Sequence, residues 1–147
     1  MLVENRQMDQ TIEPLSEDDT QRVEQQRTWV RDHYDEGVRE NYETIEGKLR
    51  VIQAILDNRW VQPTETWKLQ SLGIAFGDAV HQRLGMEWVM VADDIGRDPA
   101  LRLPNSTIIV FPLTAISKRI ERGEELNVAG LLDGFCNMVE EKRANGY

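Results

Sequence analysis

The sequence predicts an α+β fold in which N-terminal helices precede a three-stranded antiparallel meander and two C-terminal helices. Apolar residues recur at helical spacing on both sides of a central segment, Met86 to Phe111, in which they alternate with period two. Turns rich in Gly, Pro and Asn separate the alternating stretches, and such short connections favour antiparallel neighbours. We expect residues 1–15 to form a flexible tail or an arm ordered by docking, and residues 16–147 to form a single domain.

The N-terminal helices are predicted from caps and from apolar spacing. Ser16, followed by three acids, is typical of a helix start, and the helix should end near Gly37. A second helix, from about Tyr42 to Asp57, is predicted by the buried-face pattern of Ile45, Leu49, Val51, Ile52, Ile55 and Leu56.

The longest amphipathic pattern follows Pro63. Thr64 is the expected N-cap of a helix that runs to Leu84, with Gly85 just beyond its C-terminus. Gly73 and Gly77 lie one turn apart on this helix, where glycine costs stability. Close packing of another backbone is the favoured explanation, and close approach of a ligand is the alternative.

The meander is expected to consist of Met86–Asp93, Ala100–Leu103 and Ser106–Phe111, with turns between them. Trp88, Met90 and Ala92 should share one face of the first strand, with Val89 and Val91 on the other. A short helix marked by Leu113, Ile116 and Ile120 should end at Gly123, and Asn127 should cap the last helix. Its expected buried face is Val128, Leu131, Leu132, Phe135, Met138 and Val139.

Composition narrows the classes of function. The 147 residues carry 26 acidic and 17 basic side chains, a net charge of −9. This balance argues against binding to nucleic acid or to an anionic membrane surface, because both require clustered Lys and Arg. The N-terminus shows no secretory signal, and a single cysteine cannot form an internal disulfide or a thiolate metal site. We therefore expect a cytoplasmic protein without a cofactor or a metal.

The second half of the chain resembles a known family. The runs LGIAFGDAV, LGMEWVMVADDIGRDPALRL and STIIVFPLTAISKRIERGEELNV, within about residues 72–133, are similar to the bacterial domain-of-unknown-function family numbered 3806. The features that carry the resemblance as a set are Trp88, Gly96, Ala100-Leu101, Phe111-Pro112, Lys118-Arg119 and Gly123-Glu124. The resemblance implies a fold unit and a bacterial cytoplasmic setting, and it implies no catalytic residue.

Acidic side chains are the first candidates for partner binding, because residues 1–60 hold 14 of the 26 acids. Complementary charge speeds association and selects partners, whereas the alternative reading of such acids is simple solubility. The acids predicted to contact a basic partner are Glu17, Asp18, Asp19, Asp32, Asp35, Glu36 and Glu40.

Two tryptophans and three basic residues are weaker candidates for contact with a partner. Trp60 and Trp67 flank a short turn, where they form either a core corner between helices or a recognition surface. The basic cluster Lys118, Arg119 and Arg122 is either a solvated face, since glutamates follow it, or a contact for an anion or an acidic partner.

Other side chains could bind a metal or take part in catalysis, but a structural role is favoured for each. Asp93, Asp94 and Asp98 are ordinary turn residues, although three carboxylates could also bind Ca²⁺ or Mg²⁺. Cys136 and His33 are read as structural, because no partner for acid–base or nucleophilic work lies near them in sequence. His81 is read in the same way.

The leading functional hypothesis is a small, acidic, non-catalytic bacterial module that binds another protein, such as an immunity protein or a secretion chaperone or adaptor. The alternative is a small-ligand-binding protein or enzyme with a pocket between the 64–84 helix and the sheet, in which His81, Asp93 and Asp94 would act. A self-associating structural protein is a third hypothesis, and it requires an exposed apolar patch.

Overall fold

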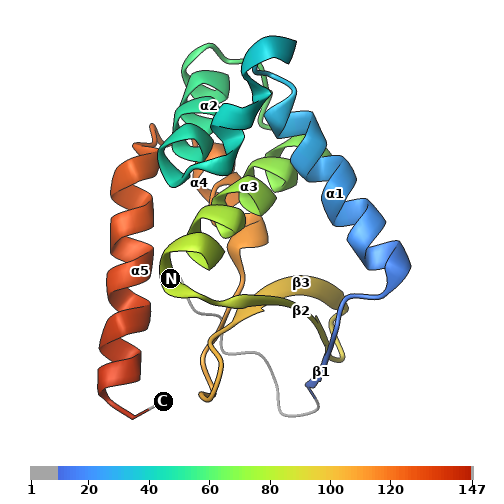
Figure 1. Cartoon of the computed structure of the whole chain (residues 1–147), viewed down its shortest axis with the longest axis vertical. Coiled ribbons are helices and arrows are strands. Elements are labelled where there is room, and N and C mark those ends of the chain that lie inside the picture. The colour runs from blue at the N-terminus through green and yellow to red at the C-terminus, as the bar shows by residue number, and fades with distance from the viewer. Residues whose placement is uncertain (1–9, 147) are drawn as a thin grey trace.

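The computed structural model describes residues 10–146, and it shows an α+β fold (Figure 1). The elements are, in chain order, β1 (Thr11–Glu13), α1 (Glu17–Arg31), the 3₁₀ segment η1 (Glu36–Glu43), α2 (Ile45–Asp57), α3 (Thr66–Leu84), β2 (Glu87–Ala92), β3 (Arg97–Arg102), β4 (Ile109–Val110), the 3₁₀ turn η2 (Pro112–Thr114), α4 (Ser117–Glu121) and α5 (Val128–Ala144).

Helix α3 is the centre of the molecule. Figure 1 shows it above the sheet, with α1 on one side and α5 on the other. Every residue from Ser71 to Val80 is buried. The main core joins α2, α3 and α5 to β3, and Phe76 of α3 meets Phe135 of α5 edge to face, with 5.5 Å between ring centroids. Burial on all sides explains why glycines are accommodated in this helix.

The two glycines of α3 mark close packing, as the favoured reading expected. A Cβ added at Gly73 would collide with the carbonyl group of Leu113 in η2. A Cβ added at Gly77 would lie 2.5 Å from the Trp88 indole of β2. Substitution by alanine therefore requires η2 or Trp88 to move away from α3.

Within the described residues the sheet has four antiparallel strands, in the order β1-β2-β3-β4, so the expected three-stranded meander is corrected. The additional strand is β1, which pairs with β2 through Thr11↔Ala92 to Glu13↔Met90. It belongs to the segment expected to be a tail or arm, of which residues 1–9 lie outside the described residues.

The bounds of the other strands also differ from expectation. β3 begins at Arg97 and includes Pro99, which was placed in the turn. Proline is tolerated there because β4 pairs only with Leu101 and Arg102, so the nitrogen of Pro99 lies beyond the end of that pairing. β4 is shorter than the expected Ser106–Phe111, since Ser106 accepts from the backbone of Ile108 and forms a turn.

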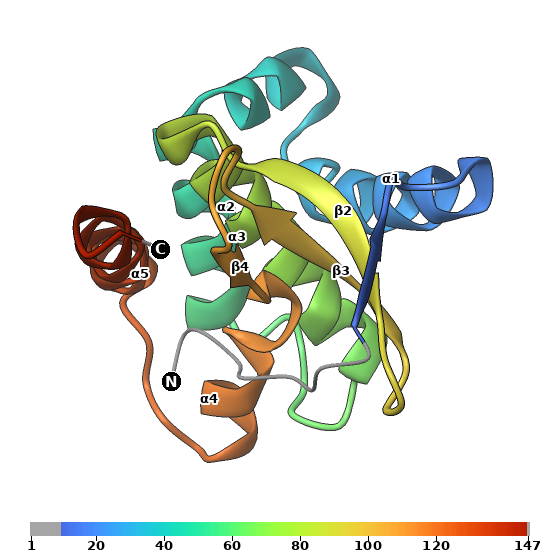
Figure 2. The same ribbon diagram turned by 90° about the horizontal axis from the view of Figure 1, so that it is seen from below.

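The two faces of β2 are both apolar, as alternation predicted. Val89 and Val91 are buried with Ala100 and Phe111 in a cluster of their own, whereas Trp88 packs against the main core. Figure 2 shows the helices gathered on one side of the sheet, with α1 beyond its β1 edge and α5 beyond β4.

Three of the predicted helix ends are confirmed, whereas several helix bounds differ from expectation. Ser16 and Asp19 form a capping box, Asn127 accepts from Gly130, and Gly85 has the left-handed φ of 70°. Helix α1 ends at Arg31 rather than near Gly37. The hydroxyl of Tyr34 instead donates to the carbonyl oxygen of Gly47 at 2.6 Å, drawing the chain toward α2.

Three further expectations need correction. Helix α2 begins at Ile45, with Thr44 as its N-cap. Thr64 does not cap α3, because the Glu65 carboxylate accepts from Gln62 and closes a separate turn, so the helix begins at Thr66. The helix expected after Pro112 is divided into η2 and α4.

Candidate binding pocket and aromatic surface

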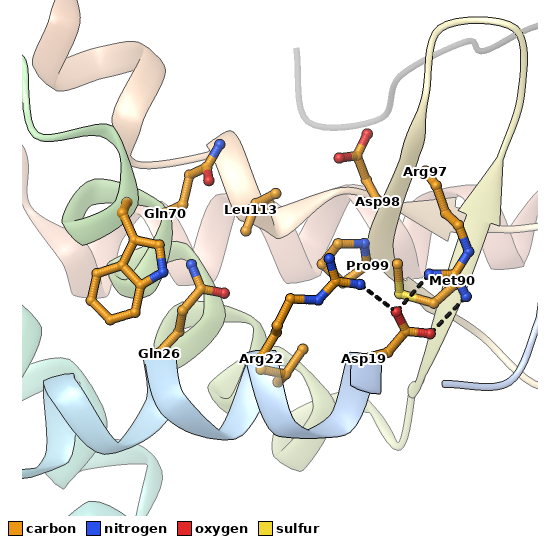
Figure 3. Close-up of a pocket in the computed structure, with 11 residues that line it drawn as sticks. Asp19, Arg22, Gln26, Gln70, Met90, Arg97, Asp98, Pro99 and Leu113 are labelled. Carbon is orange, nitrogen blue, oxygen red and sulfur yellow. Dashed lines mark hydrogen bonds and ion pairs between the residues drawn. The ribbon is translucent and has the colours of Figure 1, made fainter. Parts of the chain in front are cut away.

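A pocket of about 230 Å³ opens between α1, the first turns of α3 and the β2–β3 hairpin (Figure 3). All three elements, together with η2, contribute to its wall. The lining side chains are Asp19, Arg22, Val23, Gln26, Trp67, Gln70, Met90, Arg97, Asp98, Pro99 and Leu113.

An ion pair closes one end of this pocket and ties α1 to the hairpin. Arg97 binds both carboxylate oxygens of Asp19, at 2.5 and 2.6 Å, and its Nε donates to Glu13 at 2.9 Å. Arg22 adds a further hydrogen bond to Asp19 at 2.7 Å. The bound Arg97 guanidinium holds the pKa of the Asp19 carboxyl well below its usual range, so this carboxylate is ionised at neutral pH.

The other end of the pocket is lined by two amide side chains and a tryptophan. Gln26 is 8% exposed, and among residues 10–146 its amide makes no hydrogen bond. Figure 3 shows it extending from α1 toward Gln70 and Leu113. Trp67, at the start of α3, completes this end and is 48% exposed.

Trp67 is also part of an aromatic cluster that continues along α1. Trp29 meets Trp67 and His33 edge to face, with centroid separations of 6.2 and 4.7 Å. His33 stacks on Trp60, with 5.8 Å between centroids and 23° between planes. The Nδ1–H of His33 donates to the carbonyl oxygen of Trp29 at 2.8 Å, which fixes its ring. Trp60 and Trp67 are therefore held in place although both are half exposed.

A second polar cluster, centred on Asp78, lies farther along the boundary between α1 and α3. Asp78 is 6% exposed and accepts four hydrogen bonds. Arg27 donates from Nε and Nη2 at 2.6 and 2.8 Å, the Tyr42 hydroxyl donates at 2.8 Å, and the Trp88 indole donates at 3.1 Å. This network joins α1, η1 and β2 to α3.

The Asp78 network is built for structure rather than for reaction. The Asp78 carboxylate raises the pKa of Arg27, while burial and then Asp78 raise the pKa of Tyr42, so both donors keep their protons. Lys48 lies beside this network with its ammonium group 4.9 Å from the centre of the Tyr42 ring, and it donates to Gln82 at 2.7 Å. Burial lowers the pKa of Lys48.

The predicted acidic residues do not form one surface. Asp19, predicted to contact a basic partner, is buried and pairs with Arg97, so the structure does not present it at the surface. Glu17 and Asp18 are exposed at the start of α1, whereas Asp35, Glu36 and Glu40 are exposed after its end. The 15-residue helix between them is about 22 Å long. Asp32, at the helix C-terminus, faces Arg31 and Arg39 at 3.3 and 3.2 Å.

The groups proposed for the enzyme alternative are not brought together. His81 is exposed on the last turn of α3, where its Nδ1–H contacts the carbonyl oxygen of Met86. Asp93 and Asp94 follow the opposite end of β2, which at six residues spans about 20 Å. Asp93 accepts from the backbones of Ile95 and Gly96, as turn chemistry predicts.

The structure also gives the surroundings of the remaining candidates. Arg119 donates to the carbonyl oxygen of Ala115, Arg122 lies 3.8 Å from Glu124, and Lys118 is exposed on the same short helix, well away from α1 (Figure 2). Burial raises the pKa of the Cys136 thiol, which favours the neutral, unreactive form. Among residues 10–146, no group of three or more His, Cys, Asp or Glu side chains is placed to hold a metal ion.

Sequence reasoning missed Gln26 and Gln70, because a polar side chain on an amphipathic helix is ordinarily assigned to the solvated face. One signal was present in the chain: Gln26 lies seven residues after Asp19 on α1. That spacing places the two side chains along one side of the helix. The same side carries the aromatic Trp29.

Comparison with known proteins places this fold in a family. The family model of DUF3806, a domain of unknown function, matches residues 48–131, more than half of the chain. The chain belongs to this family. The resemblance predicted from the second half is thereby confirmed, and the match begins earlier than expected, within α2.

A solved structure shares the fold. It is a protein from Bacteroides thetaiotaomicron, determined at 1.50 Å resolution, which superposes with a TM-score of 0.67 at 17% sequence identity. The aligned region covers 88% of this chain and 48% of that protein, so the DUF3806 chain spans about half of its length. At this identity the likeness concerns the fold alone. No curated protein matches the sequence. None of the helices within residues 10–146 is long and apolar enough to cross a membrane.

Proposed function

We propose that this DUF3806 protein is a non-catalytic, protein-binding module of the bacterial cytoplasm. Its contact surface is the aromatic cluster Trp29, His33, Trp60 and Trp67, bordered by Asp35, Glu36 and Glu40. The observation that carries the proposal is the exposure of Trp60 and Trp67, which are 52% and 48% exposed. Large aromatic side chains are enriched among the residues that dominate binding energy in protein interfaces.

The rigidity of the cluster supports a binding role. Trp60 stacks on His33, and the His33 ring is fixed by its bond to the Trp29 carbonyl oxygen. Tryptophans that are already immobilised lose little side-chain freedom when a partner covers them, so more of the contact energy remains as affinity. The same rings would be better buried if their role were only to stabilise the fold.

Charge suggests the chemistry of the partner. Asp35 and Glu36 lie two and three residues after His33, and together with Glu40 they are exposed without an ion pair in the described part of the chain. Lysine or arginine side chains of a partner can pair with these acids and also lie over the indole rings. A net charge of −9 adds long-range attraction for a basic protein.

Two classes of protein work in this way. An immunity protein occupies its toxin, and a secretion chaperone or adaptor covers its client, and neither needs a catalytic group of its own. Both fit a rigid aromatic surface with an acidic border. Identification of the partner decides between them.

The experiment compares variants of the full chain against the partner that wild-type protein captures from its native cells at low salt. The partner is identified by mass spectrometry, and its dissociation constant is then measured by calorimetry. We expect the double variant W60A/W67A to weaken binding by about 30-fold or more. I95A is the matched control, because Ile95 is 79% exposed in the β2–β3 turn, outside the cluster.

A second pair of variants tests the acidic border. D35N/E36Q should weaken binding by about tenfold and reduce its salt dependence, whereas E17Q/D18N removes the same charge at the opposite end of α1 and should change little. An equal loss of affinity in both double variants would show that net charge alone attracts the partner. Unchanged affinity in W60A/W67A, with the fold intact by circular dichroism, would refute the aromatic surface.

Binding of a small ligand is the second candidate function. The pocket beside Trp67, with the Gln26 amide on its wall, favours it. This pocket is lined by α1, α3, η2 and the β2–β3 hairpin, and neither His81 nor Asp93 nor Asp94 lines it.

A further inference from the structure

A groove of about 780 Å³ lies where α2 ends and the chain passes from α4 to α5. Its floor is apolar. Val61 belongs to the main core, and Leu56, Ile120 and Leu126 pack against that core while staying partly exposed. The main core therefore reaches the surface at this groove, and a ligand that covers these side chains would remove more apolar area from water.

One glutamine holds the two walls of the groove together. Gln53 of α2 donates to the carbonyl oxygen of Leu126 at 3.0 Å and accepts from the backbone N–H of Val128 at 2.9 Å. Its amide also donates to Asp57 at 2.9 Å. These bonds fix the α4–α5 connection against α2. A groove that is already formed loses little freedom when a ligand enters it.

The rim of the groove is mainly acidic. Among the described residues that line it, Asp57, Glu124 and Glu125 stand against a single base, Arg59. Asp57 and Glu125 are exposed and make no ion pair within residues 10–146, whereas Glu124 lies 3.8 Å from Arg122. Two carboxylates beside an apolar floor are thus free to pair with the cations of a ligand.

The helix ends at the groove favour the same sign of ligand charge. Helix α2 ends at Asp57, and the C-terminal end of a helix attracts cations. Helix α5 begins at the groove with its positive end, but that end is capped by the protein itself. Gly130 donates to the Asn127 side chain, and Val128 donates to Gln53.

The openness of the groove favours a peptide over a small molecule. Sites for small molecules bury about 70–90% of their ligand. The four charged side chains on this rim are all exposed, so a ligand in the groove would keep one side in water. A segment of polypeptide can enter and leave such a groove. Its apolar side chains can cover the floor, while long basic side chains reach the rim.

We propose that this groove binds a short, extended peptide segment of a partner protein in which apolar side chains alternate with Lys or Arg. Its cations pair with Asp57 and Glu125. The groove shares no residue with the aromatic cluster, because Trp60 stacks on His33 whereas its neighbour Val61 lines the groove. The proposal is tested on the chain alone, so it stands or falls separately from the aromatic surface.

The experiment titrates the ¹⁵N-labelled full chain with tetrapeptides whose termini are acetylated and amidated. Lys-Leu-Lys-Leu is the test peptide. Glu-Leu-Glu-Leu reverses its charge, and Lys-Ser-Lys-Ser removes its apolar side chains. Pentylammonium represents a free amine. The signals followed are the backbone N–H groups of Val61, Gly123 and Leu126, which are also recorded over a range of protein concentrations without peptide.

We expect saturable shifts of these signals with Lys-Leu-Lys-Leu, with a dissociation constant on the order of a millimolar or tighter. The two control peptides and pentylammonium should bind at least about fivefold more weakly. Absence of saturable shifts, or equal binding of either control peptide, would overturn the proposal. Pentylammonium binding as tightly as the peptide would instead assign the groove to a free amine. Shifts with protein concentration alone would assign it to a second copy of the chain.

Charge variants test the rim. D57N/E125Q should weaken binding of the test peptide by about fivefold or more, and asparagine keeps an oxygen that accepts from Gln53. E17Q/D18N removes the same charge at the start of α1 and should change the affinity little. Arg59→Gly removes the like charge and should strengthen binding by about twofold. Arg59 has a φ of 55°, which suits glycine.

A matched pair of variants tests the floor. Ile120→Ala should weaken binding of the test peptide by about threefold or more, whereas Ile95→Ala makes the same change in the exposed β2–β3 turn and should not. The charge variants provide the test if Ile120→Ala folds poorly. Wild-type affinity in D57N/E125Q, or an equal loss in E17Q/D18N, would overturn the proposal.

Discussion

The boundary between α1 and α3 contains two polar clusters that differ in how fully their hydrogen bonds are made. Around Asp78, four hydrogen bonds converge on one carboxylate from Arg27, Tyr42 and Trp88. Around Gln26, seven residues away from Asp19 on the same helix, the amide lies on the wall of an open pocket and makes no hydrogen bond within the described residues. The first cluster holds the helices together, whereas the second contributes no such bond.

The contrast shows why burial alone does not identify a functional residue. Asp78 and Gln26 are about equally buried, at 6% and 8% exposure. What separates them is whether the protein itself supplies the partners, since a satisfied group gains nothing from a ligand whereas an unsatisfied one does. The following changes test this distinction in order of decreasing effect.

Asp78→Asn should have the largest effect. It leaves the Arg27 guanidinium, which is only 25% exposed, with the half-exposed Glu24 carboxylate as its one remaining counter-charge among the described residues. We expect a loss of about 2–4 kcal/mol in the free energy of unfolding, measured by urea denaturation. Asp133→Asn is the matched control, because its bond to Arg83 is at the surface and should contribute less than about 1 kcal/mol. Similar losses in both variants would contradict a structural role for the Asp78 network.

Low pH should weaken the ion pair between Asp19 and Arg97 that closes one end of the pocket. The pKa of Asp19 is lower in the folded chain than in the unfolded chain, so the unfolded state takes up a proton first as pH falls. Its contribution to stability is therefore complete above about pH 5 and declines as pH drops through the ordinary aspartate value near 3.9 and below. Asp19→Asn should lose about 1–3 kcal/mol at pH 7.

The same variant should show a smaller fall in stability between pH 5 and pH 2.5 than the wild type shows. Urea denaturation at a series of pH values measures this slope. A slope unchanged by Asp19→Asn would show that other carboxyls cause the acid sensitivity.

The aromatic cluster should matter less for stability than for binding. Trp60→Ala removes the stacking on His33 from a half-exposed side chain, so the unfolding free energy should fall by about 0.5–1.5 kcal/mol. Thermal unfolding followed by circular dichroism measures the change. A loss above about 3 kcal/mol would place Trp60 in the core and remove the main support for the recognition surface.

Much of the fold could be predicted from apolar spacing and helix caps, whereas the pocket and the Asp78 network could not. Apolar periodicity and caps such as Ser16 and Asn127 are set by neighbouring residues, so the order of helices and strands follows from the sequence. β1 has only three residues and depends on the exposed edge of β2, a contact that no local pattern reports. β4 is shorter than expected for a different reason, because Ser106 and Ile108 form a turn before it.

The site depends on contacts between distant parts of the chain. Asp19 was expected at the surface, and it is buried because Arg97, 78 positions later, pairs with it. Arg27 and Asp78 are 51 positions apart. Trp60 and Trp67 were singled out by residue type, and the structure was needed to show that they are half exposed.

Urea denaturation of Gln26→Leu tests the central distinction most directly, with Gln25→Leu as its control. Because the Gln26 amide makes no hydrogen bond within the described residues, leucine removes no bond of the fold, and the free energy of unfolding should stay within about 1 kcal/mol of the wild-type value. A loss of more than about 1 kcal/mol, absent in the control, would show that the amide has a structural role and would contradict the account.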